Sequence, residues 1–201
     1  MISLRSPLGL GSASPRRRAL LEALGIPLVV VAVDVDERGR PDETPEAYLE
    51  RVVDDKLRAV LADERARGSS VVLVADTIVL LGGQILGKPA RPDEARSMLT
   101  QLSGCAHEVR TRFALGVAGD ARAVHAETVI TTVEFRAMEV DEIDRYVATG
   151  EGSDKAGAYA IQGIGSFAVR RIEGSYANVV GLPVCEVILA LRRGGFLAAF
   201  P

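Results

Sequence analysis

The sequence predicts an α/β protein, because short runs of β-branched and apolar residues alternate with helical patterns along the chain. Its 201 residues fit one domain, or two small lobes around a cleft. A hydrophobic content of 48% is enough to fill a buried core in a chain of this length. These three observations together favour a sheet that is packed against helices.

Capping residues and glycines mark where the elements begin and end. Ser14 and Thr44 each precede a proline, which is typical of a helix start, and Gly25, Gly104 and Gly150 follow helical patterns as stop signals. The predicted strands span residues 4–10, 28–35, 71–75, 78–81, 108–117, 123–135 and 167–172. The predicted helices span residues 15–24, 44–65, 93–102, 141–148 and 182–191, and residues 152–165 form a predicted binding loop.

The start of the first predicted helix carries three consecutive cations. Ser14 is a good N-cap and Pro15 fits the first helical position, so Arg16, Arg17 and Arg18 fall in the first turn. The helix dipole already makes this end positive, and the three arginines therefore cost stability unless an anion binds. A hydroxyl, free backbone N–H groups and guanidinium groups at one helix start predict a phosphate site. The alternative is a solvated basic turn on an exposed helix.

The overall composition restricts the class of ligand. A formal net charge of −3, the absence of Trp and an aromatic content of 4% argue against a nucleic-acid-binding protein. Local basic clusters in an acidic chain indicate a small anionic ligand instead. The two cysteines, Cys105 and Cys185, lack the spacing of a zinc site or a disulfide framework. No signal peptide or apolar run of membrane-spanning length is evident, so a cytoplasmic protein without a membrane partner is expected.

Two carboxylates follow predicted strands. Asp76 comes directly after the apolar run 71–75, and the carboxyl ends of strands are where α/β folds bind ligands. A carboxylate there needs a metal ion or a lysine as its partner. Glu37 follows another strand, and the two carboxylates could share one Mg²⁺. The alternatives are that Asp76 caps a turn and that Glu37, like Asp34 and Asp36, belongs to a solvated acidic loop.

The lysines and histidines give weaker signals. Lys56 lies inside a predicted helix, where its spacing alone predicts a surface position. Lys88, between Gly87 and Pro89, lies in a rigid loop from which a cation can project into a cleft. His107 and His125 show no ligand spacing and no triad, and the chain has neither a Gly-x-Ser-x-Gly elbow nor a P-loop. These residues predict a phosphate-binding, metal-assisted α/β protein, but they do not identify its reaction.

The order of several short motifs is more specific than any one of them. From Leu10 to Pro183 the sequence resembles the Maf family of nucleotide pyrophosphatases, also called septum formation inhibitor proteins. The resemblance implies a Maf/ITPase-like α/β fold, with a mixed twisted sheet flanked by helices, in which residues 1–201 form one domain of two lobes around a central cleft. The matching segments are Ser12-Ala13-Ser14-Pro15-Arg16-Arg17, Asp36-Glu37, Asp55-Lys56, Ala75-Asp76-Thr77, Leu86-Gly87-Lys88-Pro89, Leu102-Ser103-Gly104 with His107, 155–163 and 174–183.

The resemblance also implies a reaction and a set of site residues. The family hydrolyses nucleoside triphosphates between the α and β phosphates with a divalent metal, for which Mg²⁺ or Mn²⁺ is expected. The implied catalytic residues are Asp76, Glu37, Lys56 and Lys88. Asp76 would act as general base or through the metal, for which Asp76 and Glu37 are the implied ligands. The implied substrate-binding residues are Ser12, Ser14, Arg16, Arg17, Thr77 and Gln162. A homodimer is implied as well.

The substrate branch is suggested by two of the motifs. Ala75-Asp76-Thr77 and Ile161-Gln162-Gly163 resemble the branch that acts on dTTP and UTP, in which Thr77 and Gln162 would contact the base. A pyrophosphatase of the 7-methyl-GTP branch is one alternative. A nucleotide-binding regulator of division or septum formation is another.

Overall fold

A mixed sheet flanked by helices is observed, so the predicted α/β class is confirmed. The computed structural model describes residues 1–117 and 123–200. Within these ranges seven strands form one sheet in the order β2-β1-β3-β5-β6-β7, with β4 paired to β3. Strands β1, β2 and β3 run parallel, whereas β4 and β7 are antiparallel to their neighbours. The strands are β1 (Leu8–Leu10), β2 (Leu28–Val30), β3 (Val71–Leu81), β4 (Gln84–Leu86), β5 (Ala106–Gly116), β6 (His125–Phe135) and β7 (Val169–Glu173).

The helices follow the predicted order, with one short addition. The α-helices are α1 (Pro15–Ala23), α2 (Pro45–Ala62), α3 (Pro92–Leu102), α4 (Val140–Thr149), α5 (Tyr176–Val180) and α6 (Val184–Arg193). The 3₁₀ turns are η1 (Glu64–Ala66), η2 (Ala156–Ala158) and η3 (Gly163–Ala168). In the part of the chain that the structure describes, no helix combines the length and apolar character needed to cross a bilayer.

Three predicted strand boundaries were wrong. The strands expected at 4–10 and 28–35 shorten to β1 and β2, because β1 offers β2 only three paired residues. The strand expected to end before Asp76 continues as β3 to Leu81. The β-branched residues Thr77, Ile78 and Val79 favour extended backbone, and an ion pair from Lys56 lets the Asp76 carboxylate remain inside the strand. Helix α5 was not predicted.

The chain divides into two compact units. Unit 1 comprises Met1–Asp76, Thr111–Val129 and Gly181–Pro201. Unit 2 comprises Thr77–Arg110 and Ile130–Val180. The boundaries fall within β3, β5 and β6, so these strands contribute residues to both units. The predicted single domain of two lobes around a cleft stays a prediction.

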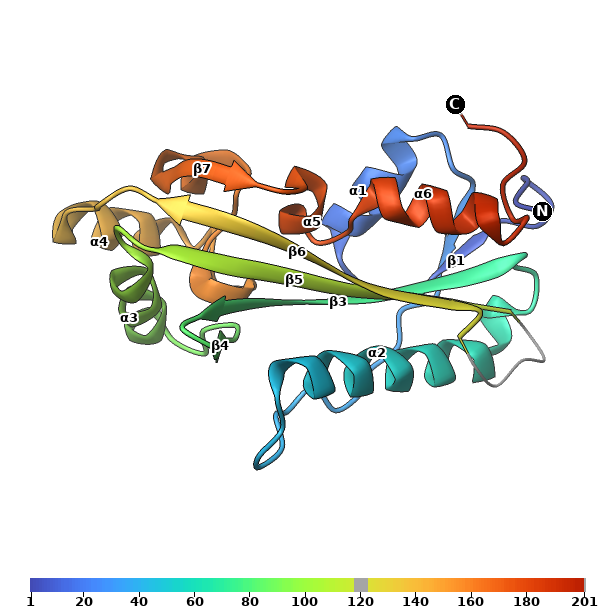
Figure 1. The fold of residues 1–201 in the computed structure, drawn as a ribbon, viewed down its shortest axis with the longest axis horizontal. Helices are drawn as coiled ribbons and strands as arrows, with labels where there is room; N and C mark the ends of the chain where they lie inside the picture. The colour runs from blue at the N-terminus through green and yellow to red at the C-terminus, as the bar shows by residue number, and fades with distance from the viewer. Residues whose placement is uncertain (118–122, 201) are drawn as a thin grey trace. The chain divides into compact units, whose positions relative to one another are not determined.

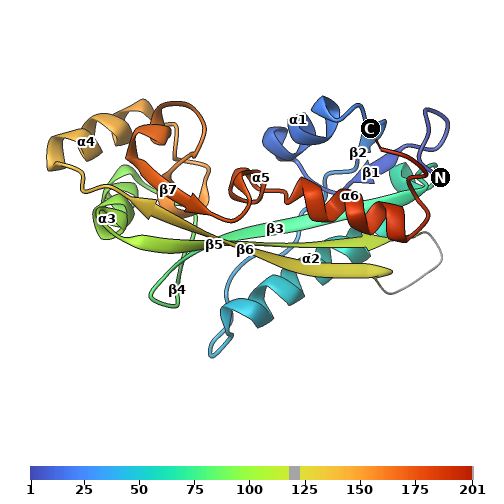
Figure 2. The same cartoon turned by 45° about the horizontal axis from the view of Figure 1, so that its top comes forward.

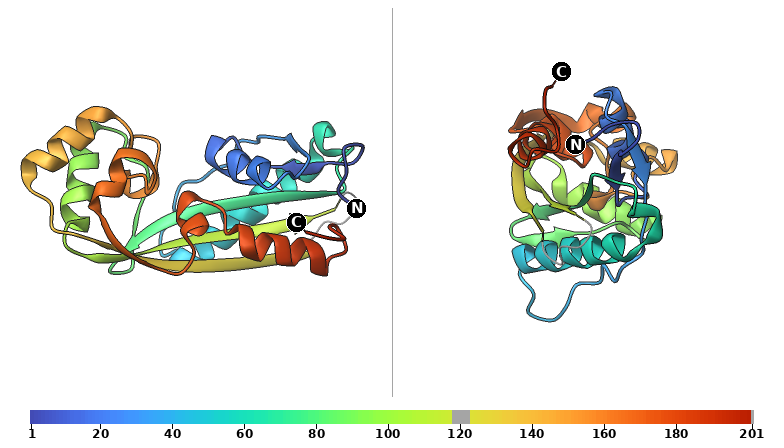
Figure 3. Two further views of the ribbon diagram at one scale, coloured as in Figure 1. Left: turned by 90° about the horizontal axis from the view of Figure 1, so that it is seen from above. Right: turned by 90° about the vertical axis from the view of Figure 1, so that its right-hand side faces the viewer.

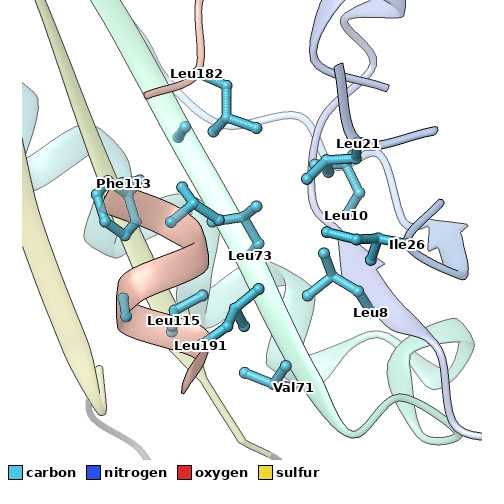
Figure 4. Close-up of a cluster of buried hydrophobic side chains, with 13 residues drawn as sticks. Leu8, Leu10, Leu21, Ile26, Val71, Leu73, Phe113, Leu115, Leu182 and Leu191 are labelled. Atoms are coloured by element: carbon cyan, nitrogen blue, oxygen red, sulfur yellow. The ribbon is translucent and has the colours of Figure 1, made fainter. Parts of the chain in front are cut away.

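Unit 1 has a core on each face of β3. Successive side chains of a strand point to opposite faces, so Val71, Leu73 and Ala75 join one cluster while Val72 and Val74 join the other. Helices α1 and α6 cover the first face and α2 covers the second (Figures 1 and 3). Figure 4 shows the first cluster, in which leucines of β1, α1 and α6 gather with Leu73 of β3. This packing holds α1 and the apolar face of α2 against opposite faces of the same strand.

Unit 2 places its helices around the outer parts of the sheet. Helix α3 packs against α4 (Figure 2), and it also packs against η2. A buried aromatic cluster of His107, Phe135 and Tyr159 joins β5, β6 and the segment after η2 through edge-to-face contacts. His107 Nε2 lies 2.9 Å from the Tyr159 hydroxyl, and burial lowers the pKa of His107 to about 4. The segment that follows η2 is therefore anchored to the sheet.

Gly11 is required where β1 leads into α1. A Cβ at this position would lie 2.5 Å from Val60 Cγ2 and 2.7 Å from Val74 Cγ1, which are both fully buried. We therefore expect Gly11→Ala to lower the free energy of unfolding by about 1–3 kcal/mol through overpacking, measured by urea denaturation. Gly68→Ala is the control, because a Cβ at that position would meet no other side chain or backbone atom within 4 Å. Equal midpoints for the two variants would contradict the close contact.

Candidate active site

The predicted cap of the first helix is confirmed. Ser14 has extended backbone angles, and its Oγ accepts a hydrogen bond from the Arg17 backbone N at 3.5 Å. Pro15 occupies the first turn of α1, as its missing N–H allows. Ser12 supports the same turn, because its Oγ accepts a hydrogen bond from the Ser14 backbone N at 3.2 Å. Both hydroxyls thus shape the entry to α1 before any ligand is considered.

The arginines at this helix start have different surroundings. Arg18 is exposed and pairs with Glu22 one turn along the helix. Arg17 is buried, and its guanidinium donates to the carbonyl of Gly181 at 2.7 Å and to that of Ala75 at 2.8 Å. For these two arginines, acceptors from the protein are already in place, a carboxylate for Arg18 and backbone carbonyls for Arg17. The substrate-binding roles of Arg16 and Arg17 stay predictions.

Arg17 donates a hydrogen bond to a carbonyl of β3 that has no partner on the neighbouring strand β1. Strand β1 pairs with β3 only as far as Leu73, whose carbonyl accepts from Gly11 N. Two residues further, the carbonyl of Ala75 points to the same side, where β1 has already ended. A buried carbonyl needs a donor, and Arg17 supplies it. This hydrogen bond holds the backbone immediately before Asp76 in place. Burial lowers the pKa of the Arg17 guanidinium, and the negative charge of Asp76 opposes this shift only in part.

The surface position expected for Lys56 was wrong. Lys56 belongs to the buried face of α2, and its Nζ lies 2.6 Å from Asp76 Oδ1 and 2.6 Å from Glu37 Oε1. Its side chain is only 9% exposed. The sequence carried a signal for this placement, because Lys56 falls at helical spacing within the apolar stripe of Leu49, Val52 and Val60. A lysine on such a stripe is buried only with a partner, and here it has two.

The loop that carries Glu37 is held against α2 by two residues that sequence reasoning missed. The Tyr48 hydroxyl donates to the Glu37 carbonyl at 2.9 Å. Arg51 donates to the carbonyl of Asp36 at 3.1 Å and forms an ion pair with Glu43 at 2.6 Å. The one feature of the sequence that places Tyr48 near this site is its position eight residues before Lys56, on the same face of the helix.

The two predicted carboxylates both contact Lys56, whereas the sequence raised the possibility that they meet around a divalent cation. Glu37 Oε1 and Asp76 Oδ1 each contact one ammonium nitrogen, so they lie no further apart than twice that contact distance. Carboxylate oxygens are suitable ligands for Mg²⁺, which usually takes one or two from the protein and others from water and phosphate. No group of three or more acidic, histidine or cysteine side chains gathers as a metal site within residues 1–117 and 123–200. Two carboxylate groups match the number of protein ligands that this cation usually takes.

The remaining predicted residues belong to unit 2. Thr77 follows Asp76 in β3, Lys88 is exposed after β4, and Gln162 is exposed directly before η3. Two of their segments are joined, because Gly157 N donates to the Gly87 carbonyl at 3.1 Å. Unit 2 thus connects the loop of Lys88 with the loop that leads to Gln162.

Comparison with known proteins shows the family to which the chain is similar. The model of the family described as Maf-like protein matches residues 7–194. A protein of Anaeromyxobacter dehalogenans (strain 2CP-1 / ATCC BAA-258) is 49% identical over 190 residues, covering 94% of each chain. A protein of Geobacter sp. (strain M21) is 50% identical over 192 residues, covering 96% of this chain and 97% of its own. A protein of Hahella chejuensis (strain KCTC 2396) is 44% identical over 191 residues, covering 95% and 94%. All three relatives are named dTTP/UTP pyrophosphatase.

Proposed function

This chain belongs to the Maf family, and from that premise we propose that it hydrolyses dTTP and UTP between the α and β phosphates. The products are the nucleoside monophosphate and pyrophosphate. The observation that carries the proposal is the Lys56 ammonium held between Asp76 and Glu37. One cation and two carboxylates in contact are suited to phosphate hydrolysis, in which positioning and charge neutralisation supply most of the rate enhancement. The names of the three relatives support dTTP and UTP as substrates.

Each residue of this cluster has a role in the proposal. Asp76 accepts the proton of the attacking water, and the charge of the leaving pyrophosphate is neutralised by nearby cations. Lys56 orients Asp76 and presents its positive charge to the phosphates. Arg17 fixes the backbone before Asp76. The proposed phosphate ligands at the start of α1 are Ser12, Ser14, Arg16 and Arg17. The family resemblance supports Lys88 as a further phosphate-binding cation.

The proposed cofactor is Mg²⁺ or Mn²⁺, held by Glu37 and Asp76. When bound there, a divalent cation supplies Lewis acidity toward phosphate oxygens and favours ionisation of water. The two carboxylate groups suit this role because they converge, and because one of them, on Glu37, is 40% exposed. A cytoplasmic location and a homodimer are further proposals from the family resemblance.

Substrate choice is proposed to depend on Thr77 and Gln162. We expect purified protein with Mg²⁺ to turn over dTTP and UTP faster than any other nucleotide of a panel that includes CTP, ATP, GTP and 7-methyl-GTP. Faster turnover of 7-methyl-GTP would assign the chain to that branch instead. Absence of turnover with every nucleotide, in Mg²⁺ and in Mn²⁺, would overturn the enzyme proposal and favour a nucleotide-binding regulator of septum formation.

A further inference from the structure

Gln162 lies at the exposed tip of a loop whose two ends are buried. Ala160 and Ile161 precede it and are almost inaccessible to solvent, and Gly165 follows it in a buried position. A side-chain amide distinguishes bases only if its position is fixed, because misplacement by about 1 Å can cost two orders of magnitude in rate. What holds the ends of this loop therefore bears on what Gln162 can select.

A tyrosine and a glutamate at the end of α4 hold both ends of the loop. The Tyr146 hydroxyl accepts a hydrogen bond from the Ala160 backbone N at 3.1 Å and donates to Glu151 Oε2 at 3.0 Å. The Glu151 carboxylate also accepts from the backbone N of Ile164 at 2.9 Å and of Gly165 at 2.8 Å. One hydroxyl–carboxylate pair thus binds the backbone two residues before Gln162 and two and three residues after it. We call it the Tyr146–Glu151 pair.

The loop fits closely around this pair. Gly163 has a φ of +68°, and a Cβ there would lie 2.2 Å from Glu151 Oε1. A Cβ on Gly165 would lie 2.7 Å from the Tyr146 hydroxyl oxygen and 2.3 Å from the Ala160 carbonyl oxygen. Glycine at both positions lets the backbone N–H groups reach the carboxylate. The loop therefore has little room to adopt another conformation while the pair is intact.

The charge of the pair agrees with its geometry. Burial opposes ionisation of Glu151, but hydrogen bonds from Gly165, Ile164 and Tyr146 outweigh it and lower the pKa of the carboxyl group. Burial raises the pKa of Tyr146, so its hydroxyl keeps its proton and remains a donor to Glu151. The Lys155 ammonium donates to the Glu151 backbone carbonyl, so the segment that leads into η2 also contacts Glu151. The carboxylate form is the one that can accept all three hydrogen bonds.

We propose that Tyr146 and Glu151 are specificity-positioning residues, which hold the Gln162 loop in the conformation that selects the base. The inference rests on the proposed function, through the role of Gln162. Neither residue is assigned to the bond-breaking step. Their loss should consequently affect discrimination between bases and KM more than kcat.

The test compares UTP with CTP, because uracil and cytosine differ in the hydrogen-bonding pattern of one edge. For Tyr146→Phe and for Glu151→Gln, we expect the ratio of kcat/KM for UTP to that for CTP to fall by about tenfold. The change should appear in KM, with kcat for UTP within about threefold of wild type. Hydrogen exchange at the amides of Ala160, Ile164 and Gly165 should accelerate in both variants.

The controls separate this inference from the function on which it rests. Asp141→Asn removes an exposed carboxylate of the same helix that forms an ion pair with Arg145, and it should leave the ratio unchanged. Gln162→Ala should lower the ratio at least as much as the pair variants. If Gln162→Ala leaves the ratio intact, base selection by Gln162 is wrong. If Gln162→Ala lowers the ratio but the folded pair variant Tyr146→Phe does not, the positioning role is overturned. Tyr146→Phe keeps the buried ring, so it still decides the question if Glu151→Gln does not fold.

Discussion

Replacement of Asp76 by asparagine should lower kcat for dTTP by about 10³-fold or more, while the Kd of the nucleotide changes little. Asparagine keeps the size of the side chain and can still accept from Lys56, but it takes no proton from water and is a poor metal ligand. Single-turnover kinetics with dTTP and Mg²⁺ measures the rate of hydrolysis, and binding of a non-hydrolysable dTTP analogue measures Kd. Loss of activity with retained binding is the expected combination.

A matched control is available in the same unit. Asp54 is an exposed aspartate of α2, and Asp54→Asn should keep kcat within about twofold of wild type. Activity of Asp76→Asn near that of Asp54→Asn, in contaminant-free protein, would remove Asp76 from the reaction. The cluster around Lys56 would then be a structural ion pair.

Replacement of Lys56 by methionine should lower both activity and stability. The Lys56 ammonium contacts both Asp76 and Glu37. The side chain of Asp76 is 11% exposed and that of Glu37 is 40% exposed. Removing one partner of a buried pair typically costs about 3–5 kcal/mol. Solvent screens Glu37, so we expect a loss of about 3 kcal/mol in the free energy of unfolding, mostly from Asp76. Urea denaturation measures this loss.

A double-variant cycle tests the origin of that loss. If the cost comes from an unpaired Asp76 carboxylate, Lys56→Met/Asp76→Asn should regain about half of the stability lost by Lys56→Met. Arg58→Met removes an exposed cation of the same helix and should change the free energy of unfolding by less than about 1 kcal/mol. Strict additivity of the two changes at Lys56 and Asp76 would contradict the ion pair.

The sequence predicted well what depends on local rules. Ser14 and Pro15 obey capping preferences that act within one turn, so the start of α1 was correct. Asp76 and Glu37 each come after an apolar run, and the sequence raised the possibility that they meet around one divalent cation. In the structure both carboxylates contact Lys56, and their binding of a cation stays a prediction.

The rest depends on contacts between distant parts of the chain. Arg17 contacts carbonyls 58 and 164 residues away, and no local pattern identifies such partners. The contact of Glu151 with Ile164 depends likewise on how the loop folds back on α4. Lys56 was the avoidable error, since its position on the apolar stripe of α2 was visible in the sequence. The strand through Asp76 was missed because its charge is neutralised by a residue of another element.

Product identification tests the central claim most directly. Wild-type protein with Mg²⁺ is incubated with dTTP, and the phosphorus products are resolved by ³¹P NMR, with Asp76→Asn as the blank. The account predicts dTMP and pyrophosphate in equal amounts, with neither detected for the variant over the same incubation time. Release of orthophosphate together with dTDP would show cleavage at the γ phosphate and would contradict the account.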